Sequence, residues 1–146
     1  MTEILEWAAR WNIPMQALAE LRVLPQAIYS ASGSEADTQA QLRLRMAQKG
    51  GHLWRNNSGA LQDATGRHVR FGLGNDSARI NAKFKSSDLI GITSNGRFIA
   101  LEVKAPGWRL PQNEREQAQE RFIMAVRACG GVASFITDVE QLECLV

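Results

Sequence analysis

A predicted β-hairpin constrains the fold of this chain more than any other stretch. Two mostly apolar runs, residues 89–92 and 98–104, flank the turn sequence Ser94-Asn95-Gly96, a pattern typical of antiparallel strands joined by a tight turn. Side chains alternate across a strand, so Glu102 and Lys104 share one face of the second run. A carboxylate and an amine therefore lie side by side at one end of an apolar strand.

Asp88 brings a third ionisable group to the same end of the hairpin, directly before the first apolar run. Burying charges is unfavourable unless they are paired or bound to a metal, so this cluster requires an explanation. Two neighbouring carboxylates suit Mg²⁺ or Mn²⁺, and an adjacent lysine could orient a water molecule or offset charge during phosphate hydrolysis. The simpler alternative is a structural ion pair between Glu102 and Lys104 on a half-buried strand.

The length of the hairpin loop decides whether the two carboxylates can share an ion. A two-residue loop would set Asp88 opposite Val103, and the Asp88 side chain would then point away from Glu102. A three-residue loop, with Gly96 in the left-handed backbone conformation, sets Asp88 opposite Glu102. A bulge elsewhere in the hairpin would have the same effect. A shared metal site therefore predicts an odd-length loop or a bulge.

The rest of the chain predicts one α/β domain that follows a helical extension. Residues 1–33 carry apolar side chains at helical spacing and predict a helical pair, whereas residues 34–146 predict the domain. In order, we expect a helix at 34–49, strands at 52–56 and 69–74, a loop at 75–85, the hairpin, a helix at 112–129, a strand at 132–136 and a short last helix. This αβββαβ order predicts a mixed sheet with helices on both faces.

The first helix of the domain is predicted to begin at Ser34, which with Asp37 forms a weak version of the capping box. We expect an alanine-rich core face beside Leu42 and Met46, made of Ala36, Ala40, Leu44 and Ala47. Glu35 lies in the first turn of this helix, where the helix dipole favours a carboxylate, and that role explains it adequately.

Positive charge is concentrated just ahead of the hairpin. The formal net charge is only +2, but residues 52–85 contain six Lys and Arg residues against two Asp. A phosphate backbone at the candidate metal site would pass this segment, although a solvated basic face explains the same charges without a ligand. The candidate DNA contacts all lie in this segment except Arg109, which follows the hairpin. They are Arg55, Asn56, Asn57, Arg70, Arg79, Lys83, Lys85 and Arg109.

The charged positions of the hairpin resemble a nuclease signature. Asp88, 13 further residues and Glu102-Val103-Lys104 resemble the P-D…(D/E)-x-K pattern of a large nuclease superfamily, with Ser87 in place of the proline. A longer ordered set of motifs over residues 34–146 resembles the virus-type replication-repair nuclease (VRR-NUC) family, which phages and prophages often encode. The set comprises Glu35, Trp54-Arg55-Asn56-Asn57-Ser58-Gly59, Ser86-Ser87-Asp88-Leu89-Ile90-Gly91, Gly96-Arg97-Phe98, Glu102-Val103-Lys104, Gln119-x-x-Phe122 and Gly130-Gly131.

The resemblance implies a restriction-endonuclease-like fold and a Mg²⁺- or Mn²⁺-dependent endonuclease that hydrolyses phosphodiester bonds in DNA. It implies that Asp88, Glu102 and the backbone carbonyl of Val103 hold the metal, and that Lys104 activates or positions the attacking water. The family is similar to junction resolvases, so branched DNA is the expected substrate. Two paired incisions in a junction imply a homodimer.

Two further residues take roles in the site through the resemblance. Glu35 is expected to point into the metal site from the first helix of the domain. Gln119 lies one turn before Phe122 on the last long helix, and is expected to face the site and to hold Lys104 or the attacking water.

The remaining features bear on compartment and on rival functions. No segment approaches the ~20 apolar residues of a membrane span, and the start of the chain has no signal-peptide pattern. We expect a cytoplasmic protein with no membrane partner, in which Cys129 and Cys144 are reduced core residues. Two other classes stay open: a non-catalytic DNA-binding module that retains the nuclease fold, and a structural α/β protein with an ion pair. The first usually loses an acid or the lysine, which are all present in this chain.

Overall fold

The computed structural model describes residues 8–10, 12–14 and 34–146. The chain divides into two compact units, residues 1–33 and 34–146, which is also where the sequence pattern changes. In the first unit, residues 8–10 are helical and the backbone turns at Asn12, after which the Ile13 N–H donates to the Ala8 carbonyl at 2.9 Å. The remainder of the predicted helical pair lies outside the described residues.

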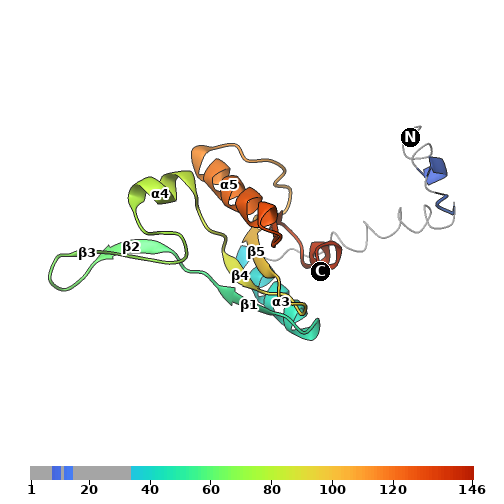
Figure 1. The fold of residues 1–146 in the computed structure, drawn as a ribbon, viewed down its shortest axis with the longest axis horizontal. Helices are drawn as coiled ribbons and strands as arrows, with labels where there is room; N and C mark the ends of the chain where they lie inside the picture. Colours follow the sequence, from blue (N-terminus) through green and yellow to red (C-terminus); the bar gives the residue numbers. More distant parts are fainter. Residues whose placement is uncertain (1–7, 11, 15–33) are drawn as a thin grey trace. The chain divides into compact units, whose positions relative to one another are not determined.

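The second unit is built on a four-stranded mixed sheet with the strand order β1-β4-β5-β6 (Figure 1). The pairs β1/β4 and β4/β5 are antiparallel, and β5/β6 is parallel. The bounds of the strands and the two long helices are α3 Glu35–Gln48, β1 His52–Arg55, β4 Leu89–Ile92, β5 Phe98–Val103, α5 Glu114–Ala128 and β6 Val132–Ile136. The predicted α/β class, with a mixed sheet flanked by helices, is confirmed.

The helices α3 and α5 cover opposite faces of the sheet (Figure 1). Alternation along the central strand β5 separates two clusters: Leu101 belongs to the core with Met46 of α3, whereas Ala100 packs in a second cluster with Ile123 of α5. Glu102 lies two residues after Ala100, and its side chain therefore lies on the α5 face. Glu102, and Lys104 two residues after it, thus lie on the face that α5 covers.

The register of the β4–β5 hairpin follows the three-residue-loop prediction. Leu89 lies opposite Leu101, so the preceding residue, Asp88, lies opposite Glu102. Beyond the last ladder pair, the Thr93 N–H donates to the Arg97 carbonyl and the Gly96 N–H donates to the Thr93 carbonyl, both at 2.9 Å. Gly96 adopts φ 81°, a left-handed conformation that a residue with a Cβ rarely takes. Asp88 and Glu102 therefore share a face, which the two-residue loop would have prevented.

The buried face of α3 differs from the prediction. Ser34 caps the helix through the predicted capping box with Asp37. Leu42 and Met46 are buried, however, whereas Leu44 is 62% exposed and the neighbouring alanines face solvent. The two larger side chains form a stripe at i and i+4 and bury more apolar area than the alanine stripe would, and this difference sets the rotation of the helix on the sheet.

The segment between β1 and β4 is more structured than predicted. Strands β2 (Gly59–Gln62) and β3 (His68–Phe71) form a separate two-stranded ribbon that extends away from the main sheet (Figure 1). The predicted loop at 75–85 contains helix α4 (Ala78–Lys83), which Ser77 caps by accepting the Ile80 N–H at 3.1 Å. The predicted strand at 69–74 corresponds to β3, which ends at Phe71. Strand β2 and helix α4 were not predicted, because each is shorter than the window that separates a helical period from a strand period.

Both cysteines are exposed, so the prediction that they are core residues is wrong. Cys129 forms the C-cap of α5 and Cys144 ends the short 3-10 helix η1 (Val139–Cys144), and the ends of both elements lie at the surface. Within residues 8–10, 12–14 and 34–146, no helix has the length and apolar character that crossing a bilayer requires.

Candidate active site

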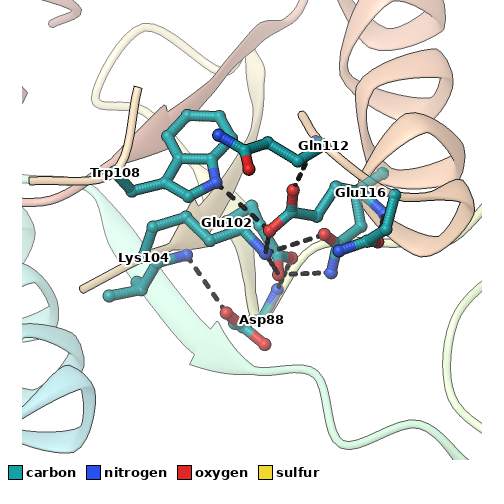
Figure 2. Close-up of polar contacts among 9 residues, drawn as sticks. Asp88, Glu102, Lys104, Trp108, Gln112 and Glu116 are labelled. Atoms are coloured by element: carbon teal, nitrogen blue, oxygen red, sulfur yellow. Dashed lines mark hydrogen bonds and ion pairs between the residues drawn. The ribbon is translucent and has the colours of Figure 1, made fainter. Parts of the chain in front are cut away.

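Two carboxylates meet at the open end of the β4–β5 hairpin, on the α5 face of the sheet (Figure 2). The Asp88 backbone N–H donates to Glu102 Oε2 at 3.2 Å, and the Val103 backbone N–H donates to Asp88 Oδ2 at 3.1 Å. These reciprocal hydrogen bonds fix each carboxylate against the backbone of the other strand. The geometric requirement for a shared ion, that both side chains lie on one face, is met.

Glu102 is buried, with only 3% of its surface exposed. Burial and, after it, the neighbouring charge of Asp88 together raise the pKa of its carboxyl from 4.5 to about 7, against the opposing effect of Lys104. A carboxylate with these neighbours is destabilised in its charged form at neutral pH. A cation at the pair would reverse that effect.

Lys104 and Gln119 complete a hydrogen-bonded chain with Glu102. The Lys104 ammonium donates to Gln119 Oε1 at 2.8 Å and lies 3.4 Å from Glu102 Oε1. Gln119 lies on α5, is 1% exposed, and donates its amide N–H to Glu102 Oε1 at 2.5 Å. The structure thus brings Gln119 to Lys104, as the resemblance implies, and it fixes the amide orientation of Gln119 from both ends.

Glu116 is a site residue that the sequence did not indicate. Its Oε1 lies 3.9 Å from the Lys104 Nζ and accepts the indole N–H of Trp108 at 3.2 Å, while its Oε2 accepts the Gln112 backbone N–H at 2.7 Å (Figure 2). The Trp108 ring also packs against Phe135, with ring centroids 4.4 Å apart. In the sequence, Asn113-x-x-Glu116 is typical of a helix N-terminus, which hides any further role of the glutamate.

Asn56 holds the segment that carries Asp88. Its backbone N–H donates to the Asp88 carbonyl at 2.7 Å, and its side-chain amide donates to Ser86 Oγ at 2.8 Å and to the Ser87 carbonyl at 2.9 Å. The amide oxygen accepts the Leu73 N–H at 3.1 Å. Since both amide hydrogens are used within the protein, Asn56 positions Asp88 and is not available as the predicted phosphate contact.

Lys85 lies close enough to the carboxylate pair to interact with it electrostatically. Burial and the nearby charge of Arg115 lower the pKa of Lys85, whereas Glu102 and Asp88 raise it, and Arg70 is a weaker opposing charge. Its backbone N–H is tied to α5 through the Ala118 carbonyl at 3.1 Å. Lys85 is thus a predicted DNA contact that lies near both carboxylates.

The other predicted DNA contacts fall into two groups. Arg70 is half-buried and its guanidinium donates to Asn75 Oδ1 at 2.8 Å and 3.1 Å, so it stabilises the turn after β3. The remaining predicted contacts are exposed on β1, α4 and the loops: Arg55, Asn57, Arg79, Lys83 and Arg109. These five side chains are accessible to a ligand.

Glu35 is not brought to the carboxylate pair. It is the first residue of α3, is exposed, and belongs to the helix that covers the opposite face of the sheet from Asp88 and Glu102. In the part of the chain that the structure describes, no three His, Cys, Asp or Glu residues form a group that could hold a metal ion. Glu35 is therefore explained by its place in the first turn of α3.

The carboxylate pair nevertheless has the donor chemistry of a divalent-cation site. Asp88 Oδ2 and Glu102 Oε2 each accept a single backbone N–H and so keep a lone pair, and within residues 34–146 no hydrogen bond reaches Asp88 Oδ1. Hard oxygen donors of this kind suit Mg²⁺ or Mn²⁺. The protein would supply two carboxylates and the adjacent Val103 carbonyl, and water or substrate would fill the other positions.

No protein-family model matches this chain, and no curated protein matches its sequence. A function for the chain therefore has to be argued from its own residues and their geometry.

Proposed function

We propose that this protein is a metal-dependent nuclease that hydrolyses phosphodiester bonds in DNA. The observation that carries the proposal is the buried Glu102 carboxylate, placed against Asp88 on one side and the Lys104 ammonium on the other. A purely structural ion pair between Glu102 and Lys104 does not require the second carboxylate. Asp88 accepts the Val103 backbone N–H, but its charge adds repulsion to a residue that is already costly to ionise.

In this proposal, Asp88, Glu102 and the Val103 backbone carbonyl hold a Mg²⁺ or Mn²⁺ ion. Such an ion, when bound, offsets charge on the phosphate and lowers the pKa of a coordinated water. The Lys104 ammonium, 3.4 Å from Glu102 Oε1, can orient the attacking water or stabilise the developing charge. Gln119 keeps Lys104 in place, because its amide oxygen accepts from the ammonium at 2.8 Å.

A nucleic-acid substrate is favoured by exposed basic side chains on β1, α4 and the loop after β5, namely Arg55, Arg79, Lys83 and Arg109. The half-buried Lys85 is close enough to both carboxylates for their charges to raise its pKa. Exposed cations of this kind can contact the phosphate backbone of a nucleic acid. We propose DNA as the substrate and branched DNA as the preferred form. The restriction-endonuclease-like arrangement, the homodimer and a cytoplasmic location belong to the same proposal.

The direct test is cleavage of supercoiled, linear and four-way-junction DNA, each incubated with Mg²⁺, with Mn²⁺ or with a chelator. The proposal predicts metal-dependent cutting that is fastest on the junction. Cutting of all three at equal rates would remove the preference for branched DNA. Binding without cutting would favour the non-catalytic module, and neither binding nor cutting would refute the proposed function.

A further inference from the structure

We propose that Glu116 is a positioning residue that holds the Lys104 ammonium in the site, an inference whose catalytic part rests on the proposed function. The Lys104 ammonium has three acceptors near it. Glu102 lies on β5, Gln119 lies in the second turn of α5, and Glu116 lies in the first turn of α5. The side chains of Lys104 and Glu116 are 14% and 15% exposed, so water screens this pair only partly.

The two oxygens of Glu116 are arranged so that its charge stays near Lys104. Gln112 N–H holds Oε2, and the Trp108 indole N–H holds Oε1 on the side that faces the ammonium. These bonds lower the pKa of Glu116, with the Gln112 bond as the largest cause and the Lys104 charge as a smaller one. Glu116 is therefore ionised at neutral pH and cannot rotate away without losing both hydrogen bonds.

Trp108 makes the arrangement depend on the loop between β5 and α5. Its ring packs against Phe135 on β6, and the Lys104 ammonium lies 5.7 Å from the centre of the same Phe135 ring. The lysine is thus enclosed by two carboxylates, an amide and an aromatic face. Among residues 34–146, removal of the Glu116 charge would leave the ammonium with Glu102 as its single anionic partner and would let its flexible stem move toward solvent.

A structural role alone would also explain part of this geometry, since Glu116 lies in the first turn of α5 and ties down Gln112. That role predicts a loss of stability without a specific effect on turnover. The chain offers a matched control in Asp37, a carboxylate that completes the capping box of α3 and has no contact with Lys104. Asp37→Asn removes a comparable helix-end interaction far from the site.

The experiment compares full-length Glu116→Gln, Asp37→Asn and Trp108→Phe with the wild type in thermal unfolding and in metal-dependent DNA cleavage. Glutamine keeps the size of the side chain and one acceptor, so Glu116→Gln should fold. We expect Glu116→Gln to lower kcat about tenfold or more, because displacing a catalytic group by ~1 Å can cost ~100-fold, while KM changes less than about twofold. Asp37→Asn should lower Tm to a similar extent and leave kcat unchanged. Unchanged kcat in Glu116→Gln would overturn the inference while leaving the proposed function intact.

A second readout does not depend on activity. In ¹⁵N-lysine NMR spectra, an ordered Lys104 ammonium should give a slowly exchanging signal, identified by its absence in Lys104→Ala. We expect this signal to be lost in Glu116→Gln and only weakened in Trp108→Phe, which keeps the Glu116 charge but removes one of the two hydrogen bonds that hold it. If the wild type cleaves no DNA, the proposed function fails, and the NMR result alone decides the positioning: loss of the signal supports it, and an unchanged signal overturns it.

Discussion

Replacing Glu102 with glutamine should flatten the pH dependence of folding stability between about pH 4.5 and pH 7. The folded protein binds a proton at Glu102 more tightly than the unfolded chain, because burial and the Asp88 charge raise its pKa from 4.5 to about 7. The stabilisation from this proton is fully present below pH 4.5 and is lost as pH rises through about 7. A shift of this size corresponds to about 3 kcal/mol of unfolding free energy, at about 1.4 kcal/mol per pH unit.

The assay is urea unfolding of the wild type and Glu102→Gln at pH 5 and pH 8, with a chelator present to exclude metal. Other titrating groups are common to both proteins, so the difference between their pH dependences isolates Glu102. The wild type should lose about 2.5 kcal/mol more than the variant between the two conditions, since pH 5 already lies above the unfolded-state pKa of 4.5. Millimolar Mg²⁺ at pH 8 should restore part of that loss in the wild type only, because bound metal favours the charged carboxylate. If the free energy of unfolding depended on pH equally in both proteins, burial would not destabilise the charged form of Glu102 and this reasoning would be refuted.

Three further predictions concern roles, packing and assembly. Asp88→Ala should lower the cleavage rate at least ~100-fold while DNA binding is kept or tightened, because a metal ligand and a negative charge are both removed. Lys104→Ala should lower the rate ~100-fold and spare metal affinity. Cleavage by Asp88→Ala at the wild-type rate would show that the site is misassigned. Ser87→Ala should raise the free energy of unfolding by about 1 kcal/mol in urea titrations, because the Ser87 hydroxyl is buried with no hydrogen-bond partner in the described part of the chain; a clear loss of stability would mean that the hydroxyl has a partner. Residues 1–33 carry apolar side chains at helical spacing and are the candidate interface of the proposed dimer. Deleting residues 1–32 should therefore convert the dimer to a monomer in sedimentation, and an unchanged oligomer would exclude this segment as the interface.

The carboxylate pair could be predicted because its causes are local. Alternation along the strand places Glu102 and Lys104 on one face, and loop length alone decides which residue lies opposite Asp88. The sequence allowed a hairpin loop of two or three residues, and the left-handed conformation of Gly96 permits the three-residue loop that the structure adopts. The site-facing position of Gln119 was implied by the resemblance, and its burial one turn before Phe122 on α5 agrees with it.

Other parts of the site depend on contacts between segments that the sequence separates. Asn56 resembled a solvent-exposed phosphate contact, and its role in holding Asp88 follows from bonds to residues 30 and 31 positions away. Glu116 resembled a capping residue, and its approach to Lys104 depends on how α5 is docked on β5. Glu35 was placed by resemblance alone, and the rotation and side of α3 decide against it. Tertiary packing, rather than local preference, set each of these outcomes.

The most direct test of the account is anomalous X-ray scattering from crystals of the protein grown with Mn²⁺. If Asp88 and Glu102 share one catalytic ion, a manganese peak should lie within about 2–2.6 Å of an oxygen from each carboxylate, and the peak should vanish in Asp88→Asn. A well-ordered crystal with no peak at this pair, or with manganese bound only at other residues, would contradict the central claim.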